Sequence, residues 1–133
     1  MTLVTEIPLA GAGGEPVDFL RTIVSHGVAK LPPNRLDFAA HALETTLPVA
    51  SGARTVRLNS ARGKLRVEVV AGSAGARVSG TLEKTVAHMF RLDEDLSAFY
   101  SMVREDAELA WCVQGAGRML RAPTVFEDVV KTI

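Results

Sequence analysis

The sequence predicts an α+β fold, in which an antiparallel sheet carries packed helices. Between residues 42 and 69, apolar and polar residues alternate, which is the period of strands that bury one face. After residue 80 the apolar residues recur at helical spacing instead. Because strands and helices come in separate blocks, and not in the regular alternation that produces parallel sheets, we expect the strands to pair antiparallel.

One strand and one helix are expected before this block. Thr2–Leu9 is predicted to form a strand that ends at Pro8 and the glycine-rich run Gly11–Gly14. A helix is predicted from Pro16 to Gly27, because proline is tolerated in a first helical turn and glycine ends helices. The apolar stripe of this helix consists of Val17, Phe19, Leu20, Ile23 and Val24.

Three short strands joined by tight turns are predicted next. Pro32 and Pro33 first make residues 30–34 a loop, since neither proline can join a helix or a central ladder. Ser51-Gly52 and Ala61–Gly63 then mark the two turns of an antiparallel meander with one buried face. The inward-facing residues are Leu43, Thr45, Leu47, Val49, Val56, Leu58, Leu65, Val67 and Val69. The residues expected to face solvent or a partner are Arg57, Lys64, Arg66 and Glu68.

Two amphipathic helices and a shorter helical stretch, over residues 107–113, are expected after the sheet. Asp93, Glu94 and Asp95 lie at the start of the second helix, where the macrodipole favours negative charge. Gly115 and Gly117 end the short stretch. The first apolar stripe is Leu82, Val86, Met89 and Phe90, and the second is Leu96, Phe99, Tyr100 and Val103.

A last helix is predicted after Pro123, because Thr124 and Glu127 have the spacing of a capping box. Its apolar stripe, which we expect to be buried, is Phe126, Val129, Val130 and Ile133. Because Ile133 lies on this stripe, whereas a natural terminus is more often polar and frayed, we expect the polypeptide to continue beyond it.

The charge of the chain is balanced, with 15 basic and 15 acidic residues. This balance counts against a freestanding nucleic-acid-binding domain, since such domains are usually basic. The charge is nevertheless uneven along the chain, because residues 21–66 are rich in Lys and Arg and residues 93–108 are rich in Asp and Glu. We interpret these stretches as two solvated faces of opposite sign.

The compartment is predicted to be the cytoplasm. The single cysteine, Cys112, allows no intrachain disulfide and fits a reducing environment. The first nine residues lack the basic region and apolar stretch of a signal peptide. No stretch approaches the roughly 20 apolar residues that cross a bilayer, so we expect no contact with a membrane.

No catalytic or metal constellation is assembled by the spacing. His26, His41 and His88 lie far apart, and neither an HExxH nor a paired CxxC pattern is present, so we expect no metal. Cys112 is predicted to be a small buried hydrophobe, not a nucleophile. The glycine run at 11–14 lacks the further glycine or the Gly-Lys-Ser/Thr of a phosphate loop and is predicted to be a flexible turn.

Three segments carry a resemblance to a known family: Phe90–Tyr100 (FRLDEDLSAFY), Gly115–Pro123 (GAGRMLRAP) and Thr124–Ile133 (TVFEDVVKTI). Together they closely resemble bacterial DNA-3-methyladenine glycosylase-like proteins of the helix-hairpin-helix DNA glycosylase superfamily, which includes the 8-oxoguanine glycosylases. Over residues 1–89 the similarity rests on element order and on Ser25-His26-Gly27 followed by Leu31-Pro32-Pro33.

This resemblance implies that residues 1–90 form an N-terminal sheet domain, similar to one TATA-binding-protein repeat. Residues 91–133 would be the opening helices of a truncated helix-hairpin-helix domain. The implied activity is hydrolysis of the N-glycosidic bond of a damaged purine, alkylated in preference to oxidised, after the nucleotide is flipped out of the duplex. The implied partners are damaged double-stranded DNA, bound by the full-length protein, and the chain's own C-terminal helical domain. No cofactor is implied.

The family's catalytic equipment, a helical hairpin and a downstream aspartate, would follow Ile133, so no catalytic residue is assigned and the chain alone is expected to be inactive. Three residues match binding positions. Gly27 resembles a glycine that lines the base pocket in the 8-oxoguanine branch. Val28-Ala29-Lys30 stand in place of the Phe-x-Trp pattern that follows it there, so we favour a helix C-cap for Gly27. Arg118 and Arg121 lie in the Gly115-Ala-Gly-Arg-Met-Leu-Arg121 segment that resembles the family, where arginines hold the domain junction or contact phosphate. We favour the junction.

An alternative function is a standalone binding or dimerisation module without enzymatic activity. In that case the apolar stripe of the last helix would be buried against a partner.

Overall fold

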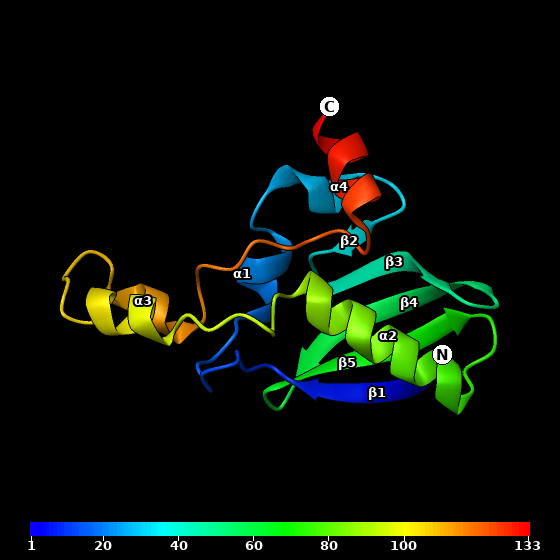
Figure 1. Ribbon diagram of the computed structural model, residues 1–133, viewed down its shortest axis with the longest axis horizontal. Helices are drawn as coiled ribbons and strands as arrows, with labels where there is room; N and C mark the ends of the chain where they lie inside the picture. Colours follow the sequence, from blue (N-terminus) through cyan, green and yellow to red (C-terminus); the bar gives the residue numbers. More distant parts are fainter.

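The computed structural model describes residues 1–133 and contains a single five-stranded antiparallel sheet (Figure 1). The strands are β1 (Thr2–Pro8), β2 (Arg35–Asp37), β3 (Ala42–Val49), β4 (Gly52–Ala61) and β5 (Lys64–Ala71). Their order across the sheet is β1-β5-β4-β3-β2. The α+β class and the meander of three consecutive strands are therefore confirmed, and one further strand flanks the meander on each side.

The meander of β3, β4 and β5 has one buried face, as predicted, because about every second side chain along these strands is buried. β2 was not predicted from the sequence. It pairs over only three residues, with Arg35 opposite Glu44 and Asp37 opposite Ala42. A strand this short has no alternation to detect, and its pairing is set by β3.

α2 (Ala76–Met89) lies across one face of the sheet (Figure 1). Leu82, Val86 and Met89 are buried in the main core, as their helical spacing predicted. Gly80 lies inside this helix and not in the loop before it. The opposite face of the sheet carries the polar side chains, which matches the predicted orientation of Arg57 and Arg66.

α1 (Phe19–Ile23) is shorter than predicted at both ends. Asp18 caps its start by accepting a hydrogen bond from the backbone N–H of Arg21 at 2.8 Å. Pro16 instead forms an isolated bridge with Ala10. The predicted C-cap role of Gly27 is wrong, because α1 ends well before it and Gly27 begins the 3-10 helix η1 (Gly27–Lys30).

α3 (Ser97–Val103) and the 3-10 helix η2 (Ala110–Gln114) form a lobe that projects from the sheet (Figure 1). Val103, Cys112 and Ala116 make a second, small core there, which confirms that Cys112 is a buried hydrophobe. The helical stretch predicted at residues 107–113 is a 3-10 helix that begins at Ala110. None of the helices is both long enough and apolar enough to cross a bilayer.

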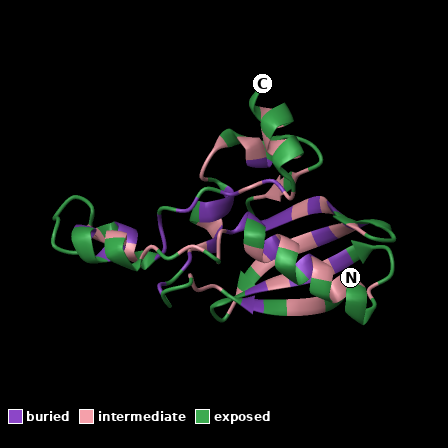
Figure 2. Cartoon of the chain, in the orientation of Figure 1, coloured by how far each residue is buried: buried purple, intermediate pink, exposed green.

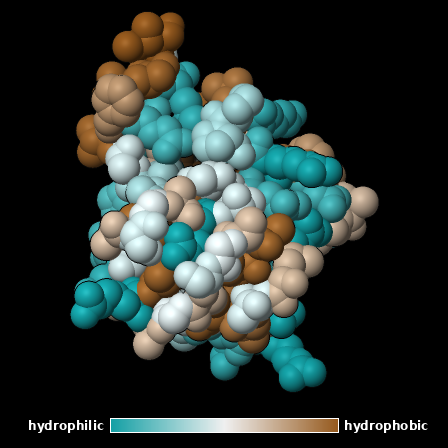
Figure 3. Space-filling model, turned by 90° about the vertical axis from the view of Figure 1, so that its right-hand side faces the viewer, coloured by the Kyte–Doolittle hydropathy of each residue, from teal (hydrophilic) through white to brown (hydrophobic).

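α4 (Val125–Thr132) begins as predicted, because the Thr124 hydroxyl accepts a hydrogen bond from the Glu127 N–H at 3.2 Å. Its apolar stripe is exposed, contrary to the prediction that it is buried. No residue of α4 is buried, and Phe126 is 78% exposed. Figure 2 colours most of this helix as exposed, and Figure 3 shows a hydrophobic patch at the top of the molecule, where Figure 1 places α4.

Candidate functional site

The junction between the sheet and α4 is built on a crossing segment, residues 116–122, which leads from the α3 lobe back to the last helix (Figure 1). Ser25 and His26 hold this segment at Leu120, whose side chain belongs to the main core. The Leu120 N–H donates to Ser25 Oγ at 3.0 Å, and the Leu120 carbonyl lies 2.7 Å from His26 Nε2. Two segments that carry the family resemblance therefore bind each other through one residue.

The tautomer of His26 follows from its second contact. The Val28 N–H donates to Nδ1 at 3.2 Å, so Nδ1 is an acceptor and the proton of the neutral ring is on Nε2. Nε2 consequently donates to the Leu120 carbonyl. His26 is thus a neutral clamp with both ring nitrogens engaged, and no metal-binding nitrogen is left free.

Arg118 is the buried centre of the junction, with a side chain that has no exposed surface. Its Nη2 donates to Glu15 Oε1 at 3.0 Å and to the Glu94 carbonyl at 2.7 Å. Its Nε donates to the Arg91 carbonyl at 3.1 Å. Since these groups surround it, Arg118 joins the N-terminal loop to the start of the lobe.

The glycine-rich run at residues 11–14 forms a turn, as predicted, closed by a hydrogen bond from the Gly14 N–H to the Gly11 carbonyl at 3.0 Å, and this turn packs against the ion pair. A Cβ at Gly11 would overlap the Glu15 carboxylate, and a Cβ at Gly13 would overlap the carboxylate of Asp95. The loop is also tied by a hydrogen bond from the Ala12 N–H to the Glu94 carbonyl at 3.1 Å. Here glycine is required by close packing, which the loop's composition alone does not reveal.

The acidic run at 93–95 precedes α3, whose first turn from Ser97 contains no acid, so the predicted place of these acids at the helix start is wrong. Asp95 accepts hydrogen bonds from the hydroxyl and the N–H of Ser97, and these bonds hold the pKa of its carboxyl below the ordinary range. Glu94 Oε1 accepts from Arg91 at 3.0 Å and from Arg121 at 2.6 Å. Glu94 therefore holds two arginines at the junction.

Arg121 lies at the surface end of the junction. Its backbone N–H donates to the Met89 carbonyl at 2.8 Å, and its guanidinium donates to the His88 carbonyl at 3.2 Å. Together with the Glu94 contact, these bonds attach the crossing segment to the end of α2. The side chain retains partial exposure, at 18%.

A groove of about 380 Å³ lies beside Arg121, between the His26–Val28 segment and the Asp128–Thr132 side of α4. Met119, Leu120 and Arg121 form its floor. Gly27 lines a separate hollow of about 230 Å³ near Phe38, so the structure does not bring it into the same cavity as Arg121. Arg118 lines neither cavity. Nothing lies within 4 Å of a Cβ placed at Gly27, so local packing does not require glycine there.

These elements define an α+β unit in which an open antiparallel sheet, covered on one face by a helix, continues into a helical lobe and a capped terminal helix. Among solved structures, the fold is similar to the 3-methyladenine DNA glycosylase from Archaeoglobus fulgidus, with a TM-score of 0.66. The similarity covers 94% of this chain and 42% of that protein, at 14% sequence identity. The chain thus spans less than half the length of the protein it resembles, and the likeness is one of fold.

No protein-family model matches the chain, and no curated protein sequence matches it. The resemblance to DNA-3-methyladenine glycosylases inferred from the sequence is confirmed at the level of the fold.

Proposed function

We propose that the chain is the N-terminal, non-catalytic portion of a DNA base-excision N-glycosylase that acts on damaged purines, alkylated in preference to oxidised. The observation that carries the proposal is the fold similarity over 94% of the chain to a 3-methyladenine DNA glycosylase. The junction supports it, because the segments that resemble the family, 25–27 and 115–123, bind each other at Leu120.

In this proposal residues 1–90 form the sheet domain and residues 91–133 the opening helices of a helix-hairpin-helix domain. Arg118 and Arg121 hold the junction and do not contact DNA phosphates. The Arg118 side chain is completely buried, and Arg121 already donates to Glu94 and to the His88 carbonyl. The exposed apolar face of α4 is the docking surface for the protein's own C-terminal helical domain, because a contiguous patch of this kind is rarely left open.

We infer that the groove beside Arg121 contributes one wall of the damaged-base pocket. Its volume, about 380 Å³, falls in the range of small-molecule sites. In this proposal only the full-length protein binds damaged double-stranded DNA. The proposed compartment is the cytoplasm, because its reducing environment suits the free thiol of Cys112.

The test compares this chain with the protein encoded by the complete reading frame, read past the codon for Ile133. We expect the complete protein to release methylated purines from alkylated duplex DNA and the 133-residue chain to release none. Base release by the short chain at a comparable rate would contradict the proposal. So would a complete reading frame that encodes no further helical domain.

A dimerisation module is the second candidate, and the exposed face of α4 is the observation that favours it. Sedimentation of the 133-residue chain tests it, with Val130→Glu as the disrupting variant, since Val130 is 53% exposed on α4. Met102→Glu is the matched control, because Met102 is 71% exposed on α3, away from that face. A dimer that is lost only in Val130→Glu would support the module. A monomer in all three proteins would exclude it.

A further inference from the structure

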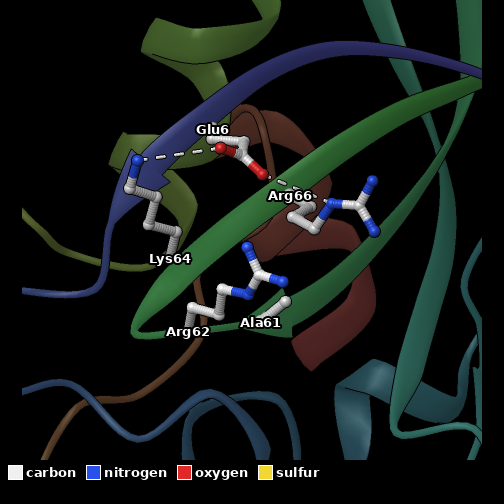
Figure 4. A pocket seen from close by; sticks show the side chains of 5 residues that line it. All are labelled: Glu6, Ala61, Arg62, Lys64 and Arg66. Atoms are coloured by element: carbon white, nitrogen blue, oxygen red, sulfur yellow. Dashed lines mark ion pairs between the residues drawn. The ribbon is translucent and has the colours of Figure 1, made fainter.

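We propose that the turn between β4 and β5 carries a phosphate-binding site. A hollow of about 380 Å³ opens there, and its lining consists of Glu6, Ala61, Arg62, Lys64 and Arg66 (Figure 4). We call this group the basic turn site. The turn lies at one end of strands β4 and β5, and the hollow shares no lining residue with the groove beside Arg121 (Figure 1).

The basic turn site has a surplus of positive charge. Glu6 is its one carboxylate and is shared, lying 3.7 Å from Lys64 Nζ and 3.4 Å from Arg66 Nε. Arg62 forms no ion pair with any carboxylate of the chain. Arg66 also pairs with Glu68, which lies outside the hollow, at 3.5 Å. Two carboxylates thus serve three cationic side chains, and the unpaired cation, Arg62, favours an added anion.

The existing ion pairs are also easy to displace. Both of the Glu6 contacts are long, and the Lys64 side chain is 53% exposed, so water screens its attraction to Glu6. A phosphate group offers several strong acceptor oxygens and matches the forked donors of arginine. Phosphate therefore suits this site better than a carboxylate with two oxygens.

The presence of arginine at the tip of the turn, in a conformation that disfavours it, is a second and independent observation. Ala61 pairs with Lys64, so Arg62 and Gly63 form a two-residue hairpin turn. Both have positive φ, 54° at Arg62 and 72° at Gly63, which is the turn type that favours Asn-Gly. Arginine is strained in this conformation, so the turn itself gives no reason for its presence. The guanidinium beside the hollow does give one.

The ligand could be free phosphate or a phosphodiester of a DNA backbone. The proposal does not depend on the glycosylase function, because the three cations are in place either way. The experiment is a titration of the ¹⁵N-labelled 133-residue chain with inorganic phosphate at constant ionic strength, followed by NMR. We expect saturable shifts confined to residues 61–66 and their neighbours on β1.

Arg62→Asn is the test variant, because asparagine suits the turn while the guanidinium and its charge are removed. Arg104→Asn is the matched control, since Arg104 is an exposed arginine in the α3 lobe. We expect phosphate affinity to fall roughly three- to tenfold in Arg62→Asn and to stay unchanged in the control. Absence of saturable shifts, or equal affinity in Arg62→Asn and the unaltered chain, would overturn the proposal.

A second titration with an undamaged DNA duplex separates the two sources of phosphate. The ligand is the DNA backbone if the duplex shifts the same resonances and if Arg62→Asn lowers the slope of log affinity against log salt concentration by about one. If only inorganic phosphate moves them, the ligand is a free phosphate group. The site is disproved if neither does.

Discussion

Arg118 and Glu15 illustrate how one residue pair holds distant parts of this chain together. Both side chains are buried, and the pair lies 3.0 Å apart across 103 residues of sequence. Arg118→Met would leave the Glu15 carboxylate buried without a partner, so we expect a loss of about 3–5 kcal/mol in the free energy of unfolding. Urea denaturation measures this loss.

Two further variants show whether the lone carboxylate is the cause. Arg104→Met, at an exposed site, should change the unfolding free energy by no more than about 0.5 kcal/mol. The double variant Arg118→Met/Glu15→Gln should be more stable than Arg118→Met, because it removes the uncompensated charge. A single variant as stable as the unaltered chain would show that the ion pair contributes nothing.

Tyr100 allows a direct measurement in the lobe, because it is the chain's single tyrosine. Its hydroxyl donates to the Ala116 carbonyl at 2.6 Å, and burial raises the pKa of the phenol above its usual value near 10. The raised folded-state pKa means that this contribution to stability is complete below pH about 10. It is lost as the pH rises through the folded pKa.

Tyrosinate absorbance during an alkaline titration therefore reports Tyr100 alone. We expect a midpoint above 10 in the folded chain and a return to about 10 in urea. A midpoint at or below 10 in the folded chain would contradict the buried hydrogen bond to Ala116.

The strained backbone of the β4–β5 turn lowers the stability of the folded chain. Asparagine adopts a positive φ more readily than arginine, so Arg62→Asn should stabilise the chain by about 1 kcal/mol. Thermal unfolding checks this, with Arg62→Ala as the comparison, because alanine has no preference for the left-handed region. A lower melting temperature for Arg62→Asn would mean that the guanidinium makes contacts that stabilise the fold.

The elements also show where sequence patterns are sufficient. β3 to β5 and α2 were predictable because each buries alternate or helically spaced residues along its whole length. α1 was overextended, since Pro16 and Gly27 look like helix boundaries while the side chain of Asp18 sets the real start. β2 escaped detection because three residues carry no period, and only the partner strand defines them.

The candidate site was less predictable than the fold. Arg118 and Arg121 came from a resemblance, whereas the Ser25 and His26 contacts to Leu120 join residues 95 and 94 positions apart, and no spacing reveals them. Glu15 was missed entirely. Glu15 stands alone between a glycine run and Pro16, and a residue in such a loop is not expected to be a buried charge.

The molecule as a whole combines an enclosed apolar core with an apolar helix face that is left open. The sheet and α2 enclose a continuous core, and the crossing segment is fixed to that core through Leu120. α4 follows directly after this segment and is held by its cap and by the bond from the Ala122 N–H to Asp128 at 2.9 Å. The junction thus positions a helix precisely at its start while leaving its apolar face open.

This difference predicts unequal hydrogen exchange along the chain. An eight-residue helix with no buried residue is marginally stable in water, so the amides of α4 should exchange at least roughly a hundredfold faster than those of α2. In the complete protein, docking of the helical domain on Phe126 and Val130 should slow them toward the rate of α2. Protection that rises with the concentration of the 133-residue chain would instead identify a second copy as the partner. Full protection in a dilute monomer would show that α4 needs no covering surface, and that the open face has no docking role.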